Sequence, residues 1–162
     1  MLQVCLWFDR AAEEAAAFYT SVLRDGSIGR TVRYLDPDPT PSNRPGEVMT
    51  VEWQAEGMRF LGLNGGPNFT FNEAISLIVT RDTQEELDEV WEALTDGGSE
   101  GPCGWCTDRF GVSWQVVPRG WDDIAASDDT EGVRRAMEAM LQMKKLDIAE
   151  LRRAFEGAHA AH

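Results

Sequence analysis

One local pattern occurs twice in this chain, and it constrains the fold more than any other feature. Residues 3–9 (QVCLWFD) read as an apolar strand, and residues 10–26 continue as a helix with apolar side chains at helical spacing and a closing Asp-Gly pair. Residues 72–98 repeat this order: a strand, a capping box formed by Thr83 and Glu86, an amphipathic helix and a glycine stop. The chain therefore reads as two copies of one module.

Each predicted helix is followed by residues typical of strands. The first copy has three such runs, at 30–35, 47–55 and 59–64, where alternating side chains and turn residues indicate antiparallel pairing. The second copy has the shorter segment 101–118, with a plausible turn at 108–111. Both copies then have the order strand, helix, strand, strand, strand. We predict an α+β fold of two βαβββ modules.

We expect a single domain over residues 1–162, with module one at 1–66, module two at 67–118 and a C-terminal helical appendage at 119–158. The appendage contains two helix patterns, and the second begins at a capping Asp147. The first places four apolar side chains on one face. Such a stripe is typical of core packing, and a groove for a ligand or a partner chain is the alternative. These side chains are Val133, Met137, Met140 and Leu141.

The charge balance favours certain partners over others. The chain has 28 acidic and 15 basic residues and a net charge of −13. Because such a field repels polyanions at long range, we expect a small molecule or a protein as the partner, with no nucleic acid and no membrane. No apolar run is long enough for a membrane span or a signal peptide, and three cysteines favour a reducing compartment. We expect a cytoplasmic protein.

The C-x-x-C pair of Cys103 and Cys106 has three interpretations. Redox activity needs a helix N-terminus that lowers a thiol pKa, whereas this pair follows a Gly-Pro step and leads into a strand and turn. Zinc needs about four ligands, and one C-x-x-C supplies half of them. The third interpretation, inert or pocket-lining thiols, is the one we favour.

Tryptophans recur in the predicted strands, at positions 7, 53, 105 and 114. Indole rings in strands usually fill a core while their N–H seeks an acceptor. Some can instead line an apolar cleft, which is the usual composition of a small-molecule site. Trp105 and Trp114 are our candidates for ligand binding, because they lie near Gln115.

Four motifs together resemble the PhnB-like proteins, whose domain is often labelled 3-demethylubiquinone-9 3-methyltransferase. This is a branch of the vicinal oxygen chelate superfamily, which also contains glyoxalases, fosfomycin-resistance proteins, extradiol dioxygenases and bleomycin-binding proteins. The match covers nearly the whole chain. The motifs are LWFD before EEAAAFY, LNGGPNFTFNEAIS, CGWCTDRFGVSWQVVP and RRAMEAMLQMKKLDIAEL.

The resemblance implies two βαβββ modules whose sheets curve around a central cleft, commonly in a dimer that can exchange modules between chains. We therefore expect a homodimer. In metal-using relatives the cleft holds a divalent cation, with His ligands from the first strands and Glu ligands from the last strands.

The residues of that metal site are largely missing from this chain. Asp108 and Gly111 match the relatives' Asp-x-x-Gly pattern, but Gln115 stands at the Glu position, and neither opening strand contains a histidine. The two histidines, His159 and His162, lie in the last four residues. We predict no metal ligands and a degenerate or absent metal site.

The superfamily geometry would direct Asn64, Asn72, Glu73 and Gln115 toward the cleft. The asparagines can instead shape turns. A carboxylate buried at the start of an apolar strand would have a raised pKa, so Glu73 is our candidate catalytic base, should it be buried. Arg109 could pair with Glu73 or lie in solvent as a turn residue.

Three functions remain open from the sequence. The first is a small-molecule binding protein, or an enzyme that no longer uses the superfamily metal. The second is a metal-dependent lyase, isomerase or dioxygenase using oxygen ligands such as Glu73, Gln115 and Asn64. The third is a methyltransferase, as the family label suggests, although the glycines of LNGGPN are followed by proline and no cofactor fingerprint is present.

Overall fold

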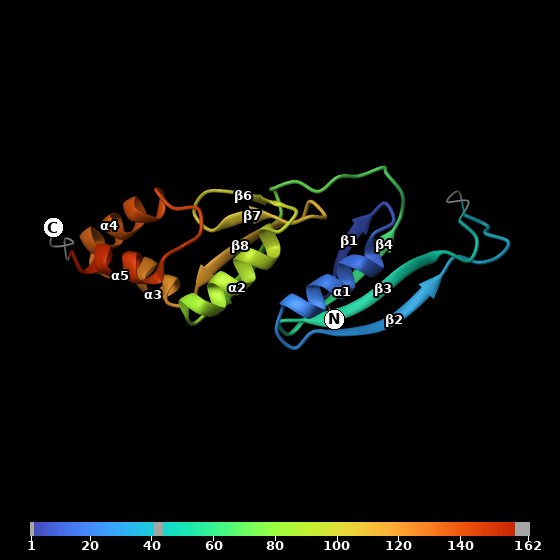
Figure 1. The fold of residues 1–162 in the computed structure, drawn as a ribbon, viewed down its shortest axis with the longest axis horizontal. Coiled ribbons are helices and arrows are strands. Elements are labelled where there is room, and N and C mark those ends of the chain that lie inside the picture. Colours follow the sequence, from blue (N-terminus) through green and yellow to red (C-terminus); the bar gives the residue numbers. More distant parts are fainter. Residues whose placement is uncertain (1, 41–43, 158–162) are drawn as a thin grey trace. The chain divides into compact units, whose positions relative to one another are not determined.

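The computed structural model describes residues 2–40 and 44–157 and divides into two compact units, residues 1–71 and 72–162 (Figure 1). Each unit contains a four-stranded sheet built in the order strand, helix, three strands, and the second unit continues with three more helices. The two predicted βαβββ modules are therefore confirmed, and with them the α+β class.

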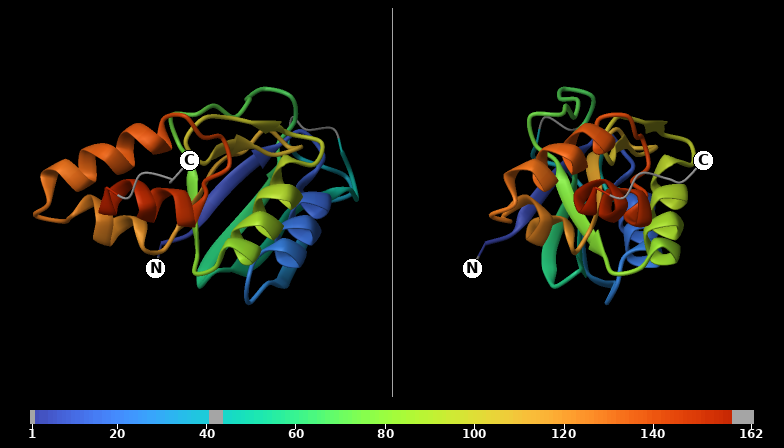
Figure 2. Two further views of the ribbon diagram at one scale, coloured as in Figure 1. Left: turned by 60° about the vertical axis from the view of Figure 1, so that its left-hand side comes forward. Right: turned by 90° about the vertical axis from the view of Figure 1, so that its left-hand side faces the viewer.

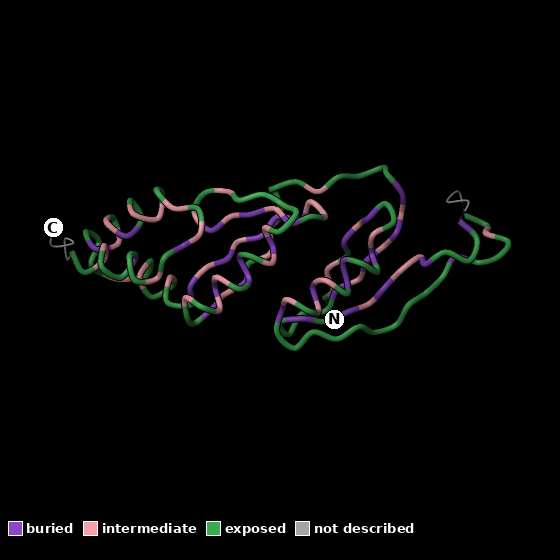
Figure 3. Tube along the Cα trace, in the orientation of Figure 1, coloured by how far each residue is buried: buried purple, intermediate pink, exposed green. Residues whose placement is uncertain are grey.

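The first unit consists of β1 (Val4–Phe8), α1 (Ala12–Val22), β2 (Ser27–Arg33), β3 (Val48–Ala55) and β4 (Met58–Asn64). The strand order is β1-β4-β3-β2, with β1 parallel to β4 and the other neighbours antiparallel. β2 is an edge strand and is exposed along its whole length (Figure 3).

Small residues let α1 lie close to its sheet. Ala12 is fully buried, and a side chain at Gly62 would come within 3.0 Å of both the Ala12 Cβ and the Trp53 ring. Beside this contact Trp53 stacks between Tyr19 and Phe60, at centroid distances of 5.8 and 5.3 Å. The core of the first unit is therefore the layer between α1 and the sheet.

The second unit opens with β5 (Leu77–Arg81) and α2 (Gln84–Thr95), followed by β6 (Ser99–Glu100), β7 (Trp105–Thr107) and β8 (Ser113–Pro118). The strand order is β5-β8-β7-β6, with β5 parallel to β8. The predicted capping box at the start of α2 is present, and the apolar stripe of this helix is buried. The stripe comprises Leu87, Val90, Trp91 and Leu94.

Three helices follow, where the sequence predicted two: the short α3 (Trp121–Ala125), α4 (Thr130–Met140) and α5 (Ile148–Glu156), gathered at one end of this unit (Figure 2). The extra helix has only five residues, too few for a periodic apolar pattern to predict it. Asp147 caps α5 as predicted, and Gly157 ends it with a left-handed φ of 75°.

The apolar stripe of α4 does not form its buried face. Met137 and Leu141 are 42% and 63% exposed, whereas Gly132 and Ala136 are buried. A side chain at Gly132 would lie 2.9 Å from the Phe155 ring of α5, so the small residues form the contact between the helices. The core interpretation is therefore wrong for Met137 and Leu141.

Among the described residues, no helix is both long enough and apolar enough to cross a membrane.

A candidate ligand pocket on the second sheet

One face of the second sheet packs against α2. Cys106 and Trp114 pair across β7 and β8, and each is 3% exposed. Glu100 pairs with Cys106 from the neighbouring strand, and its carboxylate accepts a 3.1 Å hydrogen bond from the Trp91 indole of α2. This contact identifies the Cys106 side as the helix-covered face.

The opposite side, here called the open face, carries the residues that alternate with Cys106 and Trp114 along β7 and β8. Trp105 pairs with Gln115, and Thr107 pairs with Ser113, so these four side chains share one face. Gln115 also pairs with Ile78 of β5, the strand on the other edge of β8. Ile78 is 62% exposed, so this part of the open face is accessible.

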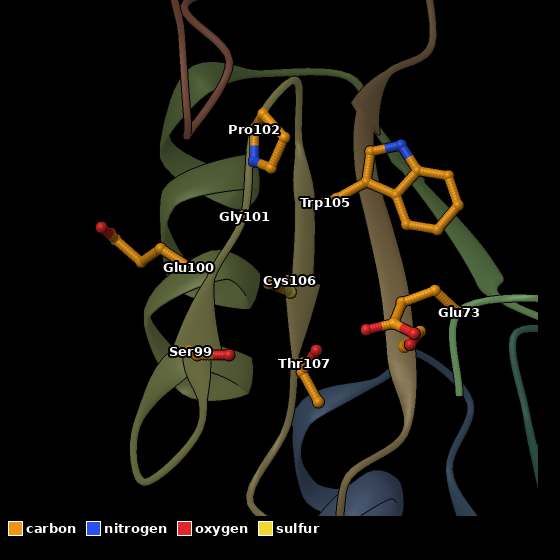
Figure 4. Close-up of a pocket in the computed structure, with 9 residues that line it drawn as sticks. Glu73, Ser99, Glu100, Gly101, Pro102, Trp105, Cys106 and Thr107 are labelled. Atoms are coloured by element: carbon orange, nitrogen blue, oxygen red, sulfur yellow. The ribbon is translucent and has the colours of Figure 1, made fainter. Parts of the chain in front are cut away.

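A hollow of about 390 Å³ lies beside β6, β7 and β8 in this unit (Figure 4). Glu73, from the loop before β5, and Trp105, from β7, both extend over β8. An indole, two carboxylates and three hydroxyls thus border one space. The lining residues are Glu73, Ser99, Glu100, Gly101, Pro102, Trp105, Cys106, Thr107 and Ser113.

The two carboxylates of the pocket differ in their surroundings. Glu100 accepts the Trp91 hydrogen bond and lies 3.3 Å from the Lys144 ammonium. These interactions lower the pKa of Glu100, with the Trp91 hydrogen bond as the larger cause. Glu73 is exposed and forms no hydrogen bond or ion pair with another described residue. Glu73 therefore supplies the unneutralised charge of the pocket.

The thiols beside the pocket are not poised for redox chemistry. Burial raises the pKa of Cys106 to about 12, and the nearby Asp108 carboxylate contributes to the increase. Because the thiolate is the reactive form, this thiol is inert at neutral pH. Cys103 lies in a turn with a φ of 57°, and no helix of the described chain begins there. The favoured interpretation of the C-x-x-C pair agrees with this arrangement.

The pocket wall at 101–106 is held by the segment 143–148, here called the docking segment. The Cys103 and Gly104 amides donate to the Met143 and Lys144 carbonyls, at 2.8 and 2.7 Å. Glycine is required at position 104, because its φ is 81° and an added Cβ would lie 2.7 Å from the Val116 carbonyl oxygen. The docking segment thus extends the hydrogen bonding of this turn.

Two side chains fasten the docking segment to the rest of the unit. Leu146 is 1% exposed and packs against Gly104. Gln84, at the start of α2, donates to the Leu146 carbonyl at 3.1 Å and accepts from the Ile148 amide at 2.8 Å. The wall of the pocket is therefore braced by residues that follow it by some forty positions in the printed sequence.

Glu73 and Trp105 line the pocket, and Gln115 shares the open face with Trp105. Gln115 donates a 2.9 Å hydrogen bond to the Ser76 hydroxyl. Asn72 accepts from the Ala74 amide at 3.0 Å and so shapes the turn before Ser76. Glu73 is exposed, so the burial on which its role as a catalytic base depended is absent.

The other two predicted ligand-binding residues have structural contacts. Asn64, in the first unit, is 4% exposed, accepts from the Ala12 amide at 2.9 Å and donates to Glu13 and to the Val48 carbonyl. Trp114 donates to the Asp108 carboxylate at 2.8 Å. We therefore build the proposed site without them.

Arg109 forms an ion pair of 2.7 Å with Asp96. This places the guanidinium at the end of α2 and fits the interpretation of Arg109 as a turn residue.

Sequence reasoning missed Thr107 and Ser113, although a signal was present. The period of two along β7 and β8 places Thr107 on the face of Trp105, and Ser113 on the face of Gln115. Glu100 and Pro102 carried no such signal. The strand β6 has only two residues, so it shows no alternation in the sequence, and Pro102 lies after its end.

The metal site that the sequence resemblance implies does not fit the residues present. No group of three or more His, Cys, Asp or Glu residues that could hold a metal occurs within 2–40 and 44–157. Gln115, at the position of the relatives' glutamate, is uncharged, and its amide is bonded to Ser76. His159 and His162 lie outside the described residues.

Comparison with known proteins now defines the family. The sequence profile of the 3-demethylubiquinone-9 3-methyltransferase family matches residues 1–117. The chain belongs to this family. The predicted PhnB-like membership is thereby confirmed.

Solved structures agree with this membership. A PhnB protein from Bacillus cereus is 32% identical, with a TM-score of 0.63, and the match covers 72% of this chain and 98% of that one. A protein from Pseudomonas aeruginosa is 22% identical, with a TM-score of 0.59 and coverage of 73% and 98%. No curated protein matches the chain. The family match ends at residue 117, so the docking segment and helices α3 to α5 lie beyond it.

Proposed function

We propose that this family member binds a small, partly apolar molecule in the pocket of its second unit. The observation that carries the proposal is the juxtaposition of the Trp105 ring and the Glu73 carboxylate over a hollow of about 390 Å³ (Figure 4). Pockets for small ligands are usually concave and largely apolar, with a few polar groups that fix orientation. Trp105 and Pro102 supply the apolar contact, and Glu73 and the hydroxyls supply the orientation.

The side chains favour binding over covalent catalysis. Cys106 is the only thiol among the lining residues, and its pKa of about 12 keeps it protonated. The described lining residues include no histidine that could activate Ser113 or Thr107 as a nucleophile. Binding or sequestration therefore accounts for the pocket without an activated nucleophile.

We also infer a homodimer in a reducing, cytoplasmic setting. The family resemblance supports the dimer, and the absence of disulfides among three free cysteines accords with the setting. Light scattering coupled to size exclusion tests the dimer directly, and a monomer mass across micromolar concentrations would refute it.

Native mass spectrometry of gently purified protein tests the binding function. A retained small molecule is expected on the wild-type chain and should be lost from Trp105→Leu. Trp121→Leu is the matched control, because Trp121 is half-buried on α3 and does not line the pocket. Equal retention by the two variants would refute the assignment of the pocket.

S-adenosylmethionine belongs in the same experiment, because the family carries a methyltransferase name. Saturable binding of this cofactor by calorimetry, lost in Trp105→Leu, would replace binding with methyl transfer as the function of the pocket.

A further inference from the structure

The charges around the pocket are unbalanced. The described lining residues include two carboxylates, of Glu73 and Glu100, and no lysine or arginine. Lys144 lies 3.3 Å from Glu100 and offsets that charge. In Figure 4 the Glu100 carboxylate points away from Trp105, whereas Glu73 lies on the Trp105 side. The ligand therefore meets one carboxylate that no described side chain neutralises.

The polar groups that accompany Glu73 can all accept hydrogen bonds. Ser113 is only 3% exposed, yet its hydroxyl lines the pocket and has no hydrogen bond to a described residue. Thr107 lies beside it through the pairing of β7 with β8. Because Ser113 lines the hollow, its hydroxyl is available to accept a hydrogen bond from a ligand that donates one.

Trp105 adds a second attraction for positive charge. The face of an indole ring attracts a cation within about 6 Å of its centre, and tryptophan is the strongest of the aromatic residues in this respect. The net charge of −13 acts in the same direction at long range, because it raises the local concentration of cations.

We propose that the ligand of this pocket is an organic cation, an amine or ammonium group carried on a small apolar body. The ammonium pairs with Glu73 and donates to Ser113, while the apolar body lies against Trp105 and Pro102. This inference rests on the proposed function and adds the ligand's charge, which the sequence alone left open. A volume of about 390 Å³ lies at the small end of the usual range for ligand sites, about 300–1,000 Å³.

Calorimetry with three probes of similar shape tests the inference: benzylamine as the cation, benzyl alcohol as the neutral form and benzoate as the anion. At pH 7 and low salt the wild-type chain should bind the cation at least tenfold more tightly than the alcohol, and benzoate most weakly. Because the attraction is partly electrostatic, added salt should weaken the binding of benzylamine more than that of the alcohol.

Two variants with the same net charge separate the pocket from the overall field. Glu73→Gln should reduce the affinity for benzylamine about tenfold, to that for the alcohol. Glu89→Gln removes an exposed carboxylate of α2 that does not line the pocket, and should leave the affinity unchanged. Circular dichroism and urea midpoints of both variants should match the wild type, because both side chains are exposed.

The outcomes distinguish the two proposals. Equal affinity for cation and alcohol, with both lost in Trp105→Leu, would overturn the cationic ligand and leave the binding function standing. Equal effects of the two glutamine variants would also overturn it, because bulk charge would then explain the preference. Failure of all three probes to bind at millimolar concentration, together with no retained molecule in native mass spectrometry, would overturn the proposed function itself.

Discussion

Substitution of Leu146 by alanine tests how far the docking segment supports the pocket wall. Leu146 is 1% exposed, so the substitution removes a fully buried side chain and leaves a void. Gly104 cannot readily move into this void, because its amide is held by the Lys144 carbonyl and its carbonyl accepts from Val116, at 2.7 and 2.8 Å. Leu→Ala costs about 2–5 kcal/mol in cores, and because the site relaxes poorly we expect a cost of at least about 3 kcal/mol.

Thiol labelling reports on the same wall. Cys106 is 3% exposed and its thiol has a pKa of about 12, so it reacts only when the 101–106 turn opens. A loss of about 3 kcal/mol corresponds to roughly a hundredfold more of the open form. Leu146→Ala should therefore lower the free energy of unfolding in urea by about that amount, and Cys106 should be labelled about a hundred times faster. The exposed Cys5 serves as the internal reference.

Leu141→Ala is the matched control, because Leu141 is 63% exposed at the end of α4. It should change the free energy of unfolding by less than about 0.5 kcal/mol. Equal effects of the two substitutions, or a Cys106 labelling rate that Leu146→Ala leaves unchanged, would refute the bracing of the pocket wall by the docking segment.

Three further predictions concern hydrogen bonds. Gln84→Ala removes both bonds to the docking segment and should cost about 1–2 kcal/mol in urea unfolding, with faster labelling of Cys106. Asn64→Ala leaves the buried Ala12 amide without its acceptor and should cost about 1–3 kcal/mol, with no change in the binding of benzylamine. The pKa of Glu100 is lowered from 4.5 in the folded chain, so its contribution to stability is complete above that pH and is lost as the pH falls through the folded value. In Glu100→Gln the urea midpoint should fall less steeply as the pH is lowered than it does in the wild type. In Glu89→Gln this dependence on pH should be the same as in the wild type.

Local signals in the sequence predicted the helices of this fold well. The capping box of Thr83 and Glu86 lies within three residues, and the side chain that caps α5, Asp147, bonds the amide of Glu150. Such contacts depend on neighbours along the chain, so their residue types and spacing carry the information. The module order followed from them, because both helices stand between strand patterns.

Contacts between distant residues could not be predicted in this way. Asn64 seemed suited to a cleft, yet its partner Ala12 begins a helix fifty-two positions earlier. Only the register of β1 with β4 brings the two together, and that register is set by packing. Likewise, nothing local to Cys103 shows that its amide bonds to the Met143 carbonyl.

The position of the docking segment bears on what relatives can reveal about this pocket. The family match ends at residue 117, and 72% of this chain already accounts for 98% of the Bacillus cereus structure. Met143 and Lys144, which hold the wall of the pocket, therefore have no counterpart in that match. Lys144 also offsets the charge of Glu100, so this appended segment sets both the shape of the wall and the balance of charge beside it. A ligand established for a shorter relative would thus need to be tested again on this chain, with Lys144→Met as the variant that restores the charge of Glu100.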